Sequence, residues 1–260
     1  MKNTIKFIPL ILLLVVLSCK KDKKDPEPEP DPTPAATTNT IKILFKHTVD
    51  TSTLVLNQNY VNPNLDTFKV SVLKYYISNI VITKNDNTTY VEPESYHLID
   101  VSNISSTTIS IPNVPFASYK SVSFMLGVDS TRNCSGAQTG DLAQNKGMFW
   151  TWASGYIMFK LEGSSPQSGA SNKGLEYHIG GFGGVNKVQR NFSYTFASTP
   201  ANVSASVSPI IHMSVDINEF FKNPTTINFA TQHTQLSAGV NAKMFADNYS
   251  DMIKFEHVNN

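Results

Sequence analysis

The sequence has few cysteines and little charge. Only Cys19 and Cys134 occur in 260 residues, so neither a disulfide framework nor a cysteine-based metal site is expected. Removal of residues 1 to 19 takes away Lys2 and Lys6 and leaves 19 Lys and Arg against 20 Asp and Glu, a net charge of −1. Without a basic surplus there is no electrostatic footprint for nucleic acid, and we expect no nucleic-acid partner.

The usual catalytic signatures are also absent. The chain contains no H-E-x-x-H, no G-x-S-x-G and no phosphate-binding loop. The glycines of 180 to 184 lack the strand-to-helix context and the lysine of a phosphate loop, so they predict a flexible turn. We therefore expect a protein that is not an enzyme.

The amino terminus has the layout of a secretory signal. Lys2 and Lys6 precede an apolar run over 7 to 17, which is shorter than the roughly 20 residues that a membrane-spanning helix needs. The run ends close to Cys19 and resembles a bacterial lipobox. This resemblance implies a lipoprotein signal peptide over 1 to 19, with lipidated Cys19 as the first mature residue and the membrane anchor.

Residues 20 to 40 predict a flexible tether. Five prolines alternate between 26 and 34, mostly with acidic residues, which favours extended polyproline II geometry. The charged run over 20 to 25 is interpreted either as a sorting signal for surface export or as a solvated spacer. We expect an outer-membrane lipoprotein that faces the periplasm or the cell surface.

Residues 41 to 260 predict one all-β domain, an antiparallel β-sandwich with one or two short C-terminal helices. Apolar alternation and turn residues separate the expected elements. The expected strands are 41 to 47, 68 to 82, 96 to 101, 107 to 111, 120 to 128, 147 to 163, 176 to 179, 191 to 196 and 203 to 215. A capping box at 216 to 219 predicts a helix that ends by Pro224, and a second helix is expected over about 237 to 248.

The stretch 147 to 163 holds both tryptophans of the chain. Read as a single strand, it places Trp150 and Trp152 on one face, about 7 Å apart, with Met148, Tyr156 and Met158. Aromatic residues at alternate positions are typical of a buried sheet face, so a plain core role is the first interpretation.

Six histidines are the candidate metal ligands. His47 continues the apolar face of its strand and is expected to be buried, whereas His178 lies beside the glycine cluster. The alternation around His212 predicts a more exposed side chain, and the context of His97, His233 and His257 predicts structural roles.

Several motifs together resemble the MbnP-like copper-binding family, which is associated with methanobactin operons and periplasmic di-haem peroxidases. The motifs are F-K-H at 45 to 47, Y-Y-I-S-N-I at 75 to 80, L-G-V-D at 126 to 129, G-M-F-W-T-W-A-S-G-Y-I-M-F-K-L-E-G at 147 to 163, Y-H-I-G-G at 177 to 181, V-D-I-N-E-F at 215 to 220 and N-Y-S-D-M at 248 to 252. They cover essentially the whole predicted domain.

The resemblance implies a Cu(I) site completed by histidines. By this resemblance Trp150 or Trp152 is oxidised to kynurenine by a di-haem cytochrome c peroxidase-like partner, and His47 and His178 are the ligands. Some copper-binding relatives have a histidine two residues from the modified tryptophan, and this chain has none there. Asp129 and Asn133 lie in a loop that is interpreted as a calcium site or as turn capping.

Two other functions fit the same residues. One is a metal-free surface lipoprotein that acts as a binding module, either with a TonB-dependent outer-membrane receptor or in adhesion. The other is a substrate of a haem oxidase without a metal role, for which an accessible tryptophan suffices. The copper hypothesis requires His47 and His178 to lie close together, because two imidazole ligands at about 2 Å from one ion are within roughly 4 Å of each other.

Overall fold

The computed structural model describes residues 37 to 151 and 153 to 260. The predicted signal peptide with Cys19, the tether up to residue 36, and Trp152 lie outside the described residues. Strand β1 begins at Thr38, so the last three residues assigned to the tether belong to a strand. Within the described ranges, no helix is long and apolar enough to cross a membrane.

The first sheet is built around β1, which pairs with β7 and β2 along one edge and β14 along the other. Its strands are β1 (Thr38–Val49), β2 (Ser52–Thr53), β7 (Thr108–Pro115), β14 (Ile210–Asp216) and β16 (Ile253–Asn259). The pairing of β1 with β14 is parallel, whereas the prediction was an antiparallel fold. A parallel partner requires a long crossover, and here most of the domain lies between the two strands.

The second sheet is built around β4, an 18-residue strand that pairs with β8 and β10 and also with three short strands. Its main path is β12 (Arg190–Thr195), β8 (Ala117–Leu126), β4 (Thr67–Lys84), β10 (Gly155–Ser164), β11 (Gly174–Gly180) and β15 (Thr234–Gln235). The attached strands are β3 (Tyr60–Val61), β5 (Thr89–Val91), β6 (Tyr96–Asp100), β9 (Phe149–Thr151) and β13 (Ala201–Val203). All pairs in this sheet are antiparallel except β11 with β15.

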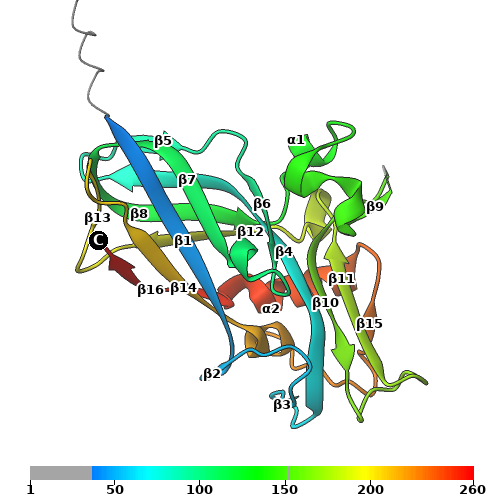
Figure 1. Ribbon diagram of the computed structural model, residues 1–260. Coiled ribbons are helices and arrows are strands. Elements are labelled where there is room, and N and C mark those ends of the chain that lie inside the picture. The colour runs from blue at the N-terminus through cyan, green and yellow to red at the C-terminus, as the bar shows by residue number, and fades with distance from the viewer. Residues whose placement is uncertain (1–36, 152) are drawn as a thin grey trace, which may run out of the picture. The chain divides into compact units, whose positions relative to one another are not determined.

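The two sheets pack face to face, and β1 crosses over β4 and β8 (Figure 1). The Phe45 ring of β1 lies 5.9 Å from that of Phe124 on β8 and 6.5 Å from that of Tyr75 on β4. Edge-to-face contacts of this kind add to the burial of apolar area. The predicted all-β sandwich is thereby confirmed.

The helices are short. They are α1 (Ser130–Asn133), α2 (Val240–Asn248) and the 3-10 turns η1 (Ile104–Thr107), η2 (Gly140–Leu142), η3 (Gln144–Lys146), η4 (Gly184–Asn186), η5 (Ile217–Phe221) and η6 (Tyr249–Asp251). The expected C-terminal helix is α2, within its predicted range. At the predicted capping box, the Asp216 side chain accepts a hydrogen bond from Asn218 N, but the turn that follows is 3-10 rather than α-helical.

The prediction of one strand over 147 to 163 is wrong. The stretch forms a hairpin in which Thr151 of β9 lies opposite Gly155 of β10. Gly155 has φ +74°, and a Cβ there would lie 2.2 Å from Asn133 Nδ2, so the reversal requires glycine. The expected strand over 203 to 215 likewise divides, into β13 and β14.

Replacement of Phe159 tests the aromatic core. Its ring is fully buried, with centroid distances of 4.8 Å to Phe220 and 6.1 Å to Tyr75. We expect Phe159→Ala to lower the free energy of unfolding by about 3 to 5 kcal/mol, because it leaves a cavity. Urea denaturation measures this change, and Val185→Ala, at an exposed position, is the control. A loss as small as that of the control would contradict the assignment.

Candidate functional site

Trp150, on β9, lies against the backbone of β11. Its side chain is half-buried, and its Cζ3 atom lies 2.6 Å from the point where a Cβ on Gly180 would be. No side chain larger than hydrogen fits beneath the ring at that position. Gly180 is therefore required by the close approach of Trp150.

The alternation of β11 shows which face of the sheet this contact is on. Leu175, Tyr177 and Ile179 are fully buried toward the core, so His178 and Gly180 belong to the opposite, outer face. Two residues along a strand span about 7 Å. The structure therefore brings two of the predicted site residues, Trp150 and His178, to one face of the second sheet.

His178 is held by a carboxylate. Its Nε2 lies 2.7 Å from Glu162 Oε1, and Lys160 Nζ lies 3.1 Å from the same oxygen. Partial burial opposes ionisation of Glu162, but the hydrogen bonds from His178 and Lys160 outweigh it and lower the pKa of the carboxyl. An ionised carboxylate only accepts hydrogen bonds, so Nε2 is the donor and Nδ1 of the neutral imidazole has a free lone pair.

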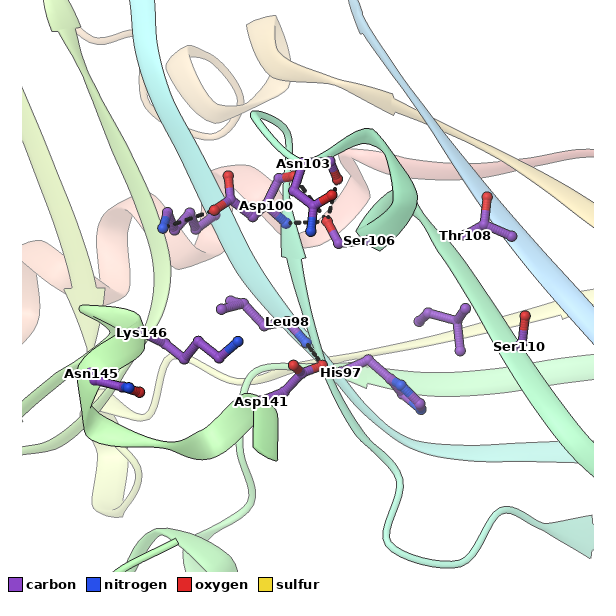
Figure 2. Close-up of a pocket in the computed structure, with 12 residues that line it drawn as sticks. His97, Leu98, Asp100, Asn103, Ser106, Thr108, Ser110, Asp141, Asn145 and Lys146 are labelled. Atoms are coloured by element: carbon purple, nitrogen blue, oxygen red, sulfur yellow. Dashed lines mark hydrogen bonds and ion pairs between the residues drawn. The ribbon is translucent and has the colours of Figure 1, made fainter. Parts of the chain in front are cut away.

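A row of charged side chains continues from His178 across the outer face. Lys160 pairs in register with both His178 and Lys74, and Lys74 Nζ lies 2.8 Å from Asp100 Oδ2. Lys74 and Asp100 also line a polar cavity of about 390 Å³, with Asp141 on its far side (Figure 2). The Asp141 carboxylate accepts a hydrogen bond from Leu98 N at 2.9 Å, at the edge of this cavity (Figure 2).

His47 occupies a different environment, inside the sandwich. Its Nε2 lies 2.9 Å from Tyr75 Oη, and its side chain is 6% exposed, as the sequence predicted. Burial lowers the pKa of His47 to about 4. Tyr75 faces the core from β4, whereas His178 is on the outer face, so the two predicted ligands lie on opposite faces of one sheet and are not brought together.

Asp129 and Asn133 serve the loop that carries them. Asp129 caps α1 by accepting from Arg132 N at 3.0 Å, and its other oxygen accepts from Tyr96 Oη at 2.5 Å. Asn133 Oδ1 accepts from Tyr156 N at 2.9 Å and anchors the hairpin. These contacts match the turn-capping interpretation, and the calcium interpretation stays a prediction.

The outer face offers one imidazole, that of His178, as a candidate metal ligand. Within 37 to 151 and 153 to 260, no three His, Cys, Asp or Glu side chains gather in a way that holds a metal. The pair of His178 with Glu162, however, is the arrangement in which a carboxylate orients a ligand imidazole. Sequence reasoning missed Glu162 and the role of Gly180. The two-residue period of a strand is the sequence signal that could have found them. Gly180, for example, follows His178 by two residues and therefore shares its face of the strand.

Replacement of Gly180 tests the position of Trp150. We expect Gly180→Val to lower the free energy of unfolding by about 1 to 3 kcal/mol, because its side chain overlaps the indole. In a Trp152→Phe background, fluorescence should shift to the red as Trp150 is displaced into solvent. Gly183→Ala is the control, since a Cβ at Gly183 meets nothing within 4 Å. Unchanged emission in Gly180→Val would refute the contact.

Acid titration tests the burial of His47. The pKa of His47 is about 4 in the folded protein, below the ordinary histidine value of 6.5. Between pH 4 and pH 6.5 the unfolded chain therefore binds more protons than the folded protein. The contribution of neutral, buried His47 to the free energy of unfolding is complete above pH 6.5. It is lost as the pH falls to 4, and the loss reaches about 3 kcal/mol. Urea denaturation at several pH values should show that His47→Gln lacks this component. If the free energy of unfolding depends equally on pH in the parent protein and in His47→Gln, the buried environment assigned to His47 is contradicted.

Comparison with known proteins gives concordant results for fold and family. The model of the family described as MbnP matches residues 38 to 242. A search of solved structures finds MbnP from Methylosinus trichosporium, with a TM-score of 0.53 and 12% identity over 75% of this chain and 80% of that chain. No curated protein matches the sequence. At this identity the structural match shows the fold alone, whereas the family model covers most of the chain, and the protein therefore belongs to the MbnP family.

Proposed function

We propose that the protein is a lipid-anchored, extracytoplasmic copper-binding protein that contributes no catalysis of its own. Membership of the MbnP family suggests a copper-related role of the methanobactin-associated kind. The observation that carries the assignment of residues is the placement of Trp150 and His178 on the same outer face of β10 and β11. This face, rather than the interior around His47, is the proposed copper site.

The chemistry of the donors suits Cu(I). A neutral imidazole is a common ligand of copper. The Glu162 carboxylate holds the proton of His178 on Nε2, so Nδ1 is the atom that offers a lone pair to the metal. Oxidation of Trp150 to kynurenine, with dioxygen or peroxide as the oxidant and the indole C2 carbon leaving as formate after hydrolysis, would supply an amine nitrogen and a ketone oxygen as donors that indole lacks. We infer that His178 and oxidised Trp150 hold the ion and that Lys160 and Glu162 position the imidazole.

The proposed oxidation requires a second protein. A di-haem cytochrome c peroxidase-like partner would reach Trp150 from the outside, since the indole is half-buried and its neighbours Thr151 and Ala153 are exposed. Lipidation at Cys19 and a tether ahead of β1 would place the domain at the outer membrane, where such a partner acts. Localisation and partnership are parts of the proposal.

Copper content and intact mass test the site together. The protein is purified from its native host and compared with Trp150→Phe, His178→Ala and Glu162→Gln after exposure to Cu(I). We expect copper and an oxidised-tryptophan mass in the parent protein and loss of copper in the first two variants. In Glu162→Gln, copper affinity should fall about 10- to 100-fold, because the carboxylate acts through His178.

His97→Ala is the matched control for His178→Ala. His97 is also paired with a carboxylate, 2.9 Å from Glu92 Oε2, but it lies on β6, separated from β11 by β4 and β10. Equal copper loss in both variants would refute a local site. Full copper retention in His178→Ala together with loss in His47→Gln would move the site to the interior.

The alternative is a metal-free binding module that works with a TonB-dependent receptor or in adhesion. The absence of a three-ligand cluster among the described residues favours it. Unmodified mass and no bound copper in the parent protein would support this alternative. An oxidised tryptophan without copper would instead indicate a substrate of the haem enzyme with no metal role.

A further inference from the structure

The edge of β1 contains a gap in strand pairing. On the side away from β14, β7 pairs with β1 as far as Leu44, and β2 pairs from Thr48 onward. Between these points, within the described chain, residues Phe45 to His47 pair with neither β7 nor β2. A cavity of about 300 Å³ opens beside this gap.

The described residues that line the cavity are mainly apolar and include no acidic side chain. Leu54 and Leu56 come from the segment between β2 and β3, and Val101 and Ile104 from the segment between β6 and β7. Its polar groups are two threonines, two histidines and one lysine. Apolar walls with a few polar groups are typical of sites for small organic molecules, and this volume is at the small end of their range.

His47 presents a hydrogen-bond donor to this cavity. Tyr75 is fully buried, and among the described residues its hydroxyl has one partner, His47 Nε2. We assign the hydroxyl as the donor to that nitrogen, because the opposite direction would leave the buried hydroxyl proton without an acceptor. A neutral imidazole then carries its proton on Nδ1. In the described structure, Nδ1 of His47 has no hydrogen-bond partner. It is not one of the polar atoms that are fully enclosed without a partner, so it is accessible from the cavity that His47 lines.

Among the described residues that line this cavity, Lys46 is the only one with a permanent charge. Its side chain is exposed and makes no ion pair in the described part of the chain, and no carboxylate lines the cavity to neutralise it. Lys46 therefore provides a positive charge, and the Nδ1–H of His47 provides a hydrogen-bond donor. Both groups favour an anionic oxygen.

We propose that the cavity beside β1 binds a small carboxylic acid with an apolar body. The carboxylate is held by Lys46 Nζ and His47 Nδ1–H, and the apolar body lies against Leu54, Leu56 and Val101. This site is on the edge of the first sheet and is separate from the outer face of β10 and β11. It does not depend on copper.

Phenylacetate and its neutral analogue phenylacetamide are suitable probes, because they share an apolar ring and differ in charge. Their binding to the copper-free mature protein is measured by ligand-observed NMR titration. We expect phenylacetate to bind at least about tenfold more tightly than the amide, since a charge-assisted hydrogen bond is lost with the amide. Lys46→Gln should weaken phenylacetate binding by a similar factor and leave amide binding nearly unchanged.

Two further variants make the test specific. Lys42→Gln is the matched control, because Lys42 is an exposed lysine of the same strand that does not line the cavity. Leu56→Trp, at a half-buried position, fills the cavity and should abolish binding of both probes without unfolding the protein. The proposal is overturned if phenylacetate does not bind at millimolar concentration, if both probes bind equally, or if Lys42→Gln weakens binding as much as Lys46→Gln.

Discussion

The alternation of β10 and β11 relative to the aromatic core determines which side chains form the candidate site. Phe159 is packed between Tyr75 and Phe220, and this contact places Phe159 and Leu161 on the inner face of β10. Lys160 and Glu162 are consequently on the outer face. Because a shift of one residue would exchange the two faces, the buried aromatic contacts also specify the surface chemistry.

Several features of the fold followed from the sequence because they depend on local patterns. The alternation around His47 and Phe45 correctly predicted an inward face, and the C-terminal helix α2 lies within the range predicted for it. Pairing partners depend on contacts between distant segments, which is why the parallel pairing of β1 with β14 was missed. The hairpin at Gly155 was read as one strand because aromatic residues alternate on both sides of the turn.

The candidate site, like the fold, could be predicted where it depends on local sequence motifs, but not where it depends on contacts between distant segments. The family motifs singled out Trp150 and His178, and the structure places both on one sheet face. Pattern alone could not show that β4 and its neighbours separate His47 from His178, because each histidine has a plausible local environment. Glu162 was missed for a related reason: its role depends on the register between β10 and β11, which pairs it with Glu176 and leaves its carboxylate diagonal to His178.

The parallel pairing of β1 with β14 also has a consequence for how the chain folds. Lys42 lies opposite Ile210, so nearly all of the second sheet precedes β14 in the chain, and β1 receives its partner on this edge late in synthesis. Closing so large a loop carries an entropic cost, and contacts between distant segments form slowly. Until β14 arrives, one edge of β1 is unpaired and open to other extended chains. During synthesis, β1 therefore depends on the C-terminal part of the chain that holds β14 for protection against misassembly.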